Sequence, residues 1–350
     1  MHDNLKNHLC EILKRYRDMG ISRQIDYEKF YLYSIIAHST AIEGSTVTEI
    51  EAQLLFDEGI TSNKRSLIEQ QMNLDLKRAY DYGREWIKAH ETITVNWLKK
   101  LSAMVMANTG NEYHTIEGDF SSAQGDLRKL NVTAGVGGRS YMSYLKVPTK
   151  LQEFCEELNR RRKTVDVNDI PAVYELSFWA HYELVTIHPW ADGNGRMSRL
   201  LMNLIQMEYD VLPSKVKKED KAKYIQALVD AREDDNIELF INCMAEIHCH
   251  HMVSDINSYI RSTGIKVVDK PTIAKEMAEK WSIKPVLADK MADILVFLAD
   301  KEFSTSVAIS QEVGMPATTV KRYLRQLVGM GYVAAHGANR NRTYNLLKFR

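Results

Sequence analysis

His188-Pro-Trp-Ala-Asp-Gly-Asn-Gly-Arg-Met-Ser-Arg199 is the stretch of this sequence that decides its fold and its chemistry. A titratable base, a carboxylate, two glycines and two arginines stand within these twelve residues. Gly193 and Gly195 permit positive φ angles and a close approach of the backbone, so that N–H groups form a nest, and the residues that follow predict the first turns of a helix. The N-terminus of a helix favours an anion such as phosphate.

The other polar residues of this stretch complete a set for phosphorus chemistry. Arg196 and Arg199 are three apart, so on a helix they share a face and can hold the far end of a polyphosphate. Asp192 can bring in Mg²⁺, which binds protein through one or two carboxylates. A neutral imidazole at His188 can accept a hydroxyl proton near neutral pH. Together they predict transfer of a phosphorus group onto a hydroxyl.

The same stretch resembles the Fic (Fido) family signature, His-x-Phe-x-Asp/Glu-Gly-Asn-Gly-Arg-x-x-Arg, with Trp190 where Phe is usual. The resemblance implies a protein adenylyltransferase, which moves AMP from ATP to a Ser, Thr or Tyr hydroxyl of a target protein and releases pyrophosphate. It implies ATP as substrate and Mg²⁺ as cofactor. The resemblance also implies a role for each residue of the motif. His188 would be the base and Asp192 the Mg²⁺ ligand. The backbone at Gly193, Asn194 and Gly195 would hold the α- and β-phosphates, and Arg196 and Arg199 would contact the β- and γ-phosphates.

Two further segments resemble parts of that family. Gly125-Asp-Leu-Arg128, Val132 and Gly135–Tyr144 resemble the flap, a hairpin that docks an extended segment of the target by strand addition. Tyr224-Ile-Gln-Ala-Leu228 resembles the helix whose tyrosine lines the adenine pocket. The acceptor is then a target protein that presents a hydroxyl to the flap, or the enzyme itself.

An inhibitory motif is the third point of resemblance. Ser39-Thr-Ala-Ile-Glu-Gly44 resembles the family's Ser/Thr-x-x-x-Glu-Gly/Asn, placed upstream of the catalytic segment as in the class with an N-terminal inhibitory helix. Ser39 and Glu43 are four apart and therefore lie on one helix face. By analogy Glu43 pairs with Arg199 and occupies the guanidinium that the γ-phosphate needs. Glu43 could instead position a water that removes AMP from a modified protein, so the reverse reaction stays open.

The periodicity of apolar residues predicts a mainly α protein, with a Fic/Fido helical core, a small β-hairpin flap and a C-terminal winged-helix domain. A helix is expected from about Asp26 to Glu43, and Thr46–Glu49 has the pattern of a capping box that opens the next one. The expected divisions are a helical region with the inhibitory helix (1–93), the catalytic core (94–250), a helical extension and linker (251–285) and a winged helix-turn-helix (286–350).

The winged-helix tail is strongly basic. Residues 313–350 contain seven Lys and Arg and no Asp or Glu, so the rest of the chain carries a net charge of −7, from 46 acidic against 39 basic residues. As a DNA module its third helix would present Thr318, Thr319, Arg322 and Arg325 to a major groove, while Arg340 and Arg342 of the wing meet phosphates. As an interaction module the same wing is merely basic. A rival hypothesis for the whole chain follows: a DNA-binding transcription regulator that uses the Fic segment as a nucleotide sensor.

Composition limits the remaining classes. The 350 residues carry 46 Lys and Arg against 46 Asp and Glu, so no whole-molecule field attracts nucleic acid or membrane. The longest apolar run, Ile294–Ala299, is far too short for a membrane span. Four scattered cysteines are typical of buried thiols in a reducing compartment, which indicates a cytoplasmic protein. A homodimer is plausible by the same family resemblance.

Overall fold

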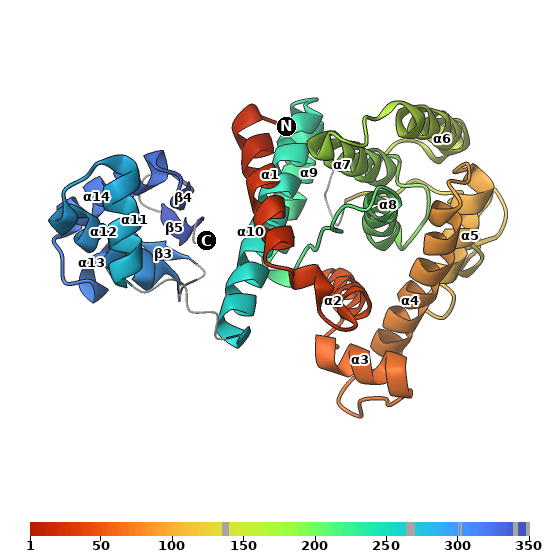
Figure 1. The fold of residues 1–350 in the computed structure, drawn as a ribbon. Coiled ribbons are helices and arrows are strands. Elements are labelled where there is room, and N and C mark those ends of the chain that lie inside the picture. Colours follow the sequence, from red (N-terminus) through yellow and green to blue (C-terminus); the bar gives the residue numbers. More distant parts are fainter. Residues whose placement is uncertain (135–139, 264–269, 300, 302, 339–341, 348–350) are drawn as a thin grey trace. The chain divides into compact units, whose positions relative to one another are not determined.

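The computed structural model describes residues 1–134, 140–263, 270–299, 301, 303–338 and 342–347 (Figure 1). Helices dominate these residues and the strands are short, which confirms the expectation of a mainly α protein. The chain divides into two compact units: Met1–Glu11 with Ser22–Cys249, and Ile12–Ile21 with His250–Arg350. Helices α1 (Asp3–Asp18) and α10 (Ile237–Thr263) each contribute to both units.

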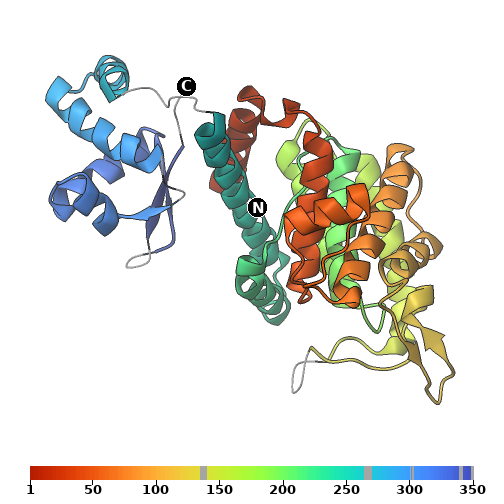
Figure 2. The same ribbon diagram turned by 90° about the horizontal axis from the view of Figure 1, so that it is seen from below.

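The first unit is built around α8 (Asn194–Glu208), with four helices packed against it (Figures 1 and 2). These four are α2 (Tyr27–Ile42), α4 (Leu67–Lys88), α5 (Val95–Val105) and α7 (Ile170–Ile187). The unit also contains α3 (Glu49–Glu58), α6 (Val147–Thr164), α9 (Lys221–Glu233) and short 3-10 turns at Ile21–Arg23, Ser122–Gln124, Tyr144–Lys146 and Lys218–Asp220. A helix enclosed by neighbours in this way must be buried on all its faces.

Burial of α8 extends to its polar residues, and two of the uncharged ones are bonded to neighbouring helices. Asn203 donates to the Tyr80 hydroxyl at 2.9 Å, and Gln206 donates to Ser177 at 2.9 Å. Gly83 of α4 allows the close approach of these two helices, because a Cβ there would lie 2.5 Å from the side chain of Leu204. The interior around α8 is therefore both tightly packed and polar at defined points.

Between α5 and α6 the chain forms loops and a small hairpin, as the glycine-rich sequence of this segment predicts. Strands β1 (Glu112–Tyr113) and β2 (Phe120–Ser121) pair antiparallel. Farther along, Thr133 and Ser140 form an isolated antiparallel bridge, so the chain doubles back here. The β-prone segment 140–144 continues into a 3-10 turn rather than a strand. Gly135, Gly137 and Gly138 of the expected flap lie outside the described residues.

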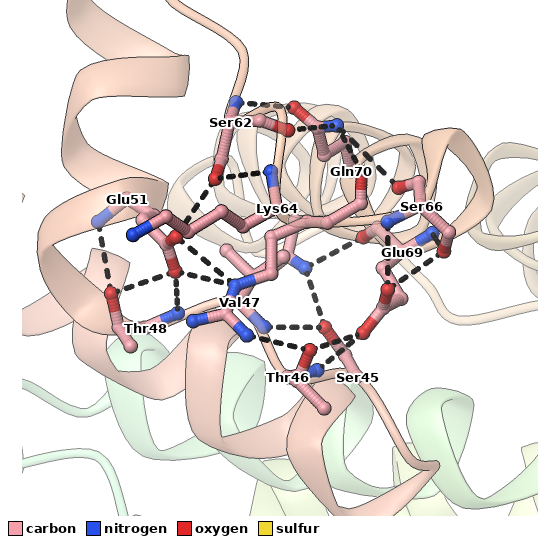
Figure 3. A network of polar contacts seen from close by, with 12 residues as sticks. Ser45, Thr46, Val47, Thr48, Glu51, Ser62, Lys64, Ser66, Glu69 and Gln70 are labelled. Carbon is pink, nitrogen blue, oxygen red and sulfur yellow. Dashed lines mark hydrogen bonds and ion pairs between the residues drawn. The ribbon is translucent and has the colours of Figure 1, made fainter.

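A polar network fixes the loops at both ends of α3 (Figure 3). The capping box of α3 is formed by Thr48 and Glu51, and that of α4 by Ser66 and Glu69. The prediction of a box at Thr46–Glu49 was therefore wrong by two residues. Thr46 instead donates its N–H and its hydroxyl to Glu69, at 2.6 and 2.7 Å. The loop that follows α2 is in this way tied to the start of α4.

The second unit contains the expected winged helix-turn-helix pattern. Its core is formed by apolar side chains of all four helices and two of the three strands, among them Leu295, Ile309, Leu324 and Leu346. The strands form an antiparallel sheet in the order β3-β5-β4. The elements are α11 (Lys270–Trp281), α12 (Pro285–Ala299), β3 (Ser304–Thr305), α13 (Ser306–Glu312), α14 (Ala317–Gly329), β4 (Val333–His336) and β5 (Thr343–Leu346).

Helix α11 differs from the expectation of a linker over Arg261–Pro285. Its apolar residues are sparse, but Ile273 and Met277 are four apart, share one face and are buried in the core of this unit. Ala274 and Ala278 pack against the same core, so α11 is held by one apolar side that its many polar residues obscure in the sequence.

We predict that the Figure 3 network makes the first unit sensitive to acid. Hydrogen bonds from Ser66 and Thr46 lower the pKa of Glu69 to about 2, from an ordinary 4.5. Since the folded state lowers this pKa, the stabilisation is complete above pH 4.5 and is lost as the pH falls toward 2. Glu69→Gln should lower the melting temperature at pH 7 by a few degrees and flatten its decline toward pH 3, measured by circular dichroism. Glu58→Gln is the matched control, because Glu58 is exposed and forms no ion pair with the described residues. Equal pH profiles for the two variants would contradict the prediction.

Candidate active site

The segment between α7 and α8 is shaped by two residues in the left-handed conformation. His188 ends α7 with φ 52° and Gly193 precedes α8 with φ 82°. Within the segment, the Asn194 side chain accepts from the N–H of Trp190 at 3.1 Å and donates to its carbonyl at 2.8 Å. Because the Asn194 amide is used inside the loop, this residue can offer a ligand its backbone N–H.

Trp190 anchors the loop to the segment before the flap. Its side chain is fully buried, and the indole N–H donates to the carbonyl of Gly125 at 3.2 Å. Phenylalanine, the usual residue at this position of the Fic signature, has no N–H group to donate. The swap therefore adds a hydrogen bond between the loop and the segment that precedes the flap.

His188 is held as a neutral base. Its Nδ1 lies 3.2 Å from the carbonyl of Val185, and a carbonyl can only accept, so Nδ1 carries the proton and Nε2 has the free lone pair. Burial, with smaller contributions from Arg128 and Arg232, lowers the pKa of His188 to about 4. At neutral pH the imidazole is therefore uncharged and able to accept a proton.

Arg128 joins the flap to the catalytic loop, a role that the sequence did not reveal. The buried guanidinium donates through Nε to the carbonyl of His188 at 2.7 Å and through Nη2 to that of Met142 at 2.6 Å. Its backbone N–H donates to the carbonyl of Pro189 at 3.0 Å. Arg128 was read only as part of the flap segment, because nothing in its local pattern indicates these partners.

Arg199 is the most enclosed charge of the site. Its side chain is 3% exposed and lies on the first turns of α8. Nε donates to the Ser39 hydroxyl at 2.9 Å, while Nη2 donates to the Ser39 carbonyl at 3.0 Å and to Glu43 at 2.5 Å. The structure thus brings together the two residues of the expected inhibitory motif and the second arginine of the loop motif.

Glu43 lies over the N-terminal turn of α8. A Cβ at Gly195 would be 2.6 Å from the Glu43 carboxylate, so only glycine leaves room for it. Burial acts to raise the pKa of Glu43, but Arg199, with help from Arg196 and Lys221, holds it below the ordinary value. The carboxylate is therefore ionised at neutral pH and stands where an anion is favoured.

Arg196 contacts α5 and the turn that follows it. Nη1 donates to the carbonyl of Val105 at 3.3 Å, and Nη2 lies 2.9 Å from the sulfur of Met106. Its Nε is buried and has no hydrogen-bond acceptor among the described residues.

Asp192 is exposed beside the glycine turn. Its Oδ1 accepts from the N–H of Gly193 at 2.6 Å, and no hydrogen bond to Oδ2 is found among the described residues. A free carboxylate oxygen next to a phosphate nest fits Mg²⁺, which takes few carboxylates and completes its shell with phosphate and water.

Tyr224 of α9 is buried, with 1% of its surface exposed. Its hydroxyl lies 2.9 Å from Nε2 of His181, and burial raises the pKa of the phenol. His181 is fully buried, and burial lowers its pKa to about 3. His181 was not predicted from the sequence, because a single histidine on a helix has no distinguishing local pattern.

Lys221, also missed, stands at the start of the same helix. Its ammonium donates to the carbonyl of Ile42 at 2.7 Å, one of the terminal carbonyls of α2. A cation at a helix C-terminus is stabilising. Lys221 therefore holds the end of the helix that carries Glu43.

The candidate DNA contacts lie in the second unit. On α14, Thr318, Arg322 and Arg325 are exposed and Thr319 is half-buried. The opposite side of that helix, including Val320 and Leu324, is buried in the core. Arg342 is exposed, and Arg340 lies outside the described residues.

Comparison with known proteins supports these assignments of fold. Residues 92–206 match the Fic/DOC family, and residues 287–337 match the IclR helix-turn-helix domain. The protein adenylyltransferase Fic of Drosophila erecta is 29% identical over 213 residues, which are 60% of this chain and 39% of that protein. The one from Nematostella vectensis is 28% identical over 233 residues, 66% of this chain and 49% of that protein. The chain thus spans less than half the length of these curated relatives.

Solved structures give the same fold. Fic-1 from C. elegans superposes with a TM-score of 0.58 at 22% identity, covering 74% of this chain and 72% of that one. A Fic family protein from Desulfovibrio desulfuricans has a TM-score of 0.55 at 18% identity, covering 98% of this chain and 94% of that one. In the described part of the chain, every helix is too short or too polar to cross a bilayer.

We predict that the indole hydrogen bond of Trp190 contributes measurably to stability. Trp190→Phe leaves the carbonyl of Gly125 without its donor and should cost about 1–2 kcal/mol more than an equivalent change elsewhere. Trp97→Phe is the matched control, because Trp97 is equally buried while its indole N–H has no partner among the described residues. Urea unfolding followed by far-ultraviolet circular dichroism measures both. Equal losses of unfolding free energy would show that the hydrogen bond adds nothing.

Proposed function

We propose that this chain, which carries a Fic/DOC domain over residues 92–206, transfers AMP from ATP to a hydroxyl side chain of a target protein. The observation that supports it best is a neutral imidazole with a free Nε2, at the start of the segment that leads to a glycine-opened helix N-terminus and a buried arginine. That combination offers a base and an anion site within one short segment. The names of the relatives, protein adenylyltransferase Fic, agree with it.

The proposed reaction follows from these positions. Nε2 of His188 accepts the proton of the target hydroxyl, and the oxygen forms a bond to the α-phosphorus of ATP. The bond from that phosphorus to the bridging oxygen breaks, and pyrophosphate leaves with its electron pair. The backbone N–H groups of residues 193–195 hold the α- and β-phosphates, while Arg196 and Arg199 hold the β- and γ-phosphates. Mg²⁺, held by Asp192 and the phosphates, would neutralise charge on the leaving group.

We further propose that Glu43 keeps the enzyme inactive. Its carboxylate uses Nη2 of Arg199, the guanidinium assigned to the γ-phosphate, and it lies over Gly195 where phosphate would approach. Two anions cannot share that place without strong repulsion. Ser39 supports the arrangement, because its hydroxyl and carbonyl orient the same guanidinium.

Glu43→Gly should raise the labelling of protein by α-labelled ATP about tenfold or more, since each 1.36 kcal/mol of relieved competition gives a factor of ten. Glu58→Gly is the control, as the same substitution at the end of α3, away from Arg199. His188→Ala should abolish labelling in the Glu43→Gly background. Mass spectrometry of the labelled protein identifies the transferred group.

An unchanged rate in Glu43→Gly would remove the inhibitory role. Labelling that persists in the double variant would place the base elsewhere. If Glu43→Gly instead stops the removal of AMP from a modified protein, the reverse reaction is the main activity.

A second candidate function, binding of duplex DNA, is favoured by the exposed basic side of α14 within a match to a helix-turn-helix family. The recognition helix of such domains lies in the major groove. Three basic residues of α14, Lys321, Arg322 and Arg325, are exposed. The transcription-regulator hypothesis depends on this unit, and it is compatible with catalysis by the other.

Arg325→Gln should weaken binding of the full chain to duplex DNA and reduce the slope of log K against log salt by about 0.9, the amount for one lost phosphate contact. Lys290→Gln is the control, since Lys290 is an exposed cation on α12 of the same unit. Fluorescence anisotropy at several salt concentrations measures both slopes. Equal slopes for the two variants and the unaltered chain would argue that α14 does not face DNA.

A further inference from the structure

Three side chains from different elements form a stack beside the candidate base. The ring of Tyr141, in the flap segment, lies against the imidazole of His188 with centroids 3.8 Å apart and planes 22° apart. On Tyr141, the guanidinium carbon of Arg232, from α9, lies 4.6 Å from the ring centroid. Tyr141 is held in place by its N–H, which donates to the carbonyl of Val132 at 3.0 Å.

Arg232 differs from Arg128 and Arg199 in its hydrogen bonds. Arg128 and Arg199 donate to carbonyls, hydroxyls or carboxylates, as described above. The Nε of Arg232 is buried and has no acceptor, and no carboxylate among the described residues is paired with this guanidinium. A half-buried cation without a counter-charge is costly. Because the side chain is only half-buried, its guanidinium can take an anion from outside the chain.

The geometry of the stack leaves Arg232 able to bind that anion. A cation–π contact uses the flat face of a guanidinium. No hydrogen bond of this guanidinium is found among the described residues, and its two Nη groups match the two oxygens of a carboxylate. Tyr141 is thus a positioning residue that holds the guanidinium of Arg232 beside the candidate base.

The place of Arg232 favours an anion on the target over one on the nucleotide. The groups assigned to the triphosphate, Arg199 and the turn at Gly195, are gathered around Glu43. Arg232 instead contacts Tyr141, in the segment assigned to target docking. We propose that Arg232 is a specificity-determining residue that binds an Asp or Glu side chain close in sequence to the acceptor hydroxyl, an inference that rests on the proposed transferase function.

The test compares modified sites across enzyme variants. Cell extract is incubated with ATP, Mg²⁺ and the Glu43→Gly chain, alone or combined with Arg232→Gln, Arg232→Glu or Arg232→Lys, and AMP-bearing peptides are sequenced by mass spectrometry. With Arg232 present, Asp and Glu should be enriched within about three residues of the acceptor, the reach of adjacent side chains on an extended strand. Arg232→Gln should reduce that enrichment about fivefold. Arg232→Glu should favour Lys and Arg, and Tyr141→Phe should retain the acidic preference because it keeps the ring.

Two results would overturn the inference while the transferase function stands. One result is that the residues around the modified hydroxyl are the same for all variants. The other is a rise in KM for ATP in Arg232→Gln with unchanged flanking sequences, which would assign the guanidinium to a phosphate. Loss of transfer in every variant at 232, the Lys variant included, would show a catalytic need instead of selection and would also overturn it. If the Glu43→Gly chain itself modifies nothing, the proposed function fails, and this inference fails with it.

Discussion

The buried guanidinium of Arg199 is the interaction on which the first unit depends. A charge enclosed by α8 and its neighbours has lost its water and must be paired. In the structure Ser39 and Glu43 supply that pairing, and they do so from a different helix. The same requirement makes the site attractive to the end of a triphosphate. Under the proposed function, inhibition by Glu43 and binding of the γ-phosphate are therefore two ways of meeting one electrostatic need, and each excludes the other.

The surrounding structure keeps the reacting groups in register with that charge. Trp190 donates to Gly125, which precedes the expected flap, and Arg128 of the flap segment donates to the carbonyl of His188. These two hydrogen bonds tie the loop at 188–199 to the flap segment. Lys221 bonds to the C-terminal end of α2, and the Figure 3 network ties the loop that follows α2 to the start of α4. The proposed base, anion site and inhibitory carboxylate are consequently held by hydrogen bonds from residues that have no part in the proposed reaction.

Much of the site could be predicted from the sequence, because its residues follow one another closely in the chain. The loop from His188 to Arg199 gives its turn, its helix and its charges within twelve residues. The capping box was misplaced because two Ser/Thr-x-x-Glu patterns overlap at 46–51, and a tertiary partner, Glu69, decides between them. His181 and Arg232 were missed for a related reason: a single histidine or arginine in a helix has no signature until its neighbours in space are known. Helix α11 was missed because its few apolar residues, two of them alanines, give a weak periodic pattern.

Helix α9 links three parts of the first unit through three of its side chains. Lys221 contacts the end of α2, Tyr224 the buried His181, and Arg232 the flap tyrosine. A thirteen-residue helix moves as a rigid rod, so these three contacts shift together. Under the proposed roles of Arg232 and Glu43, a substitution that shifts α9 would alter target choice and inhibition together, so the two properties are coupled in evolution.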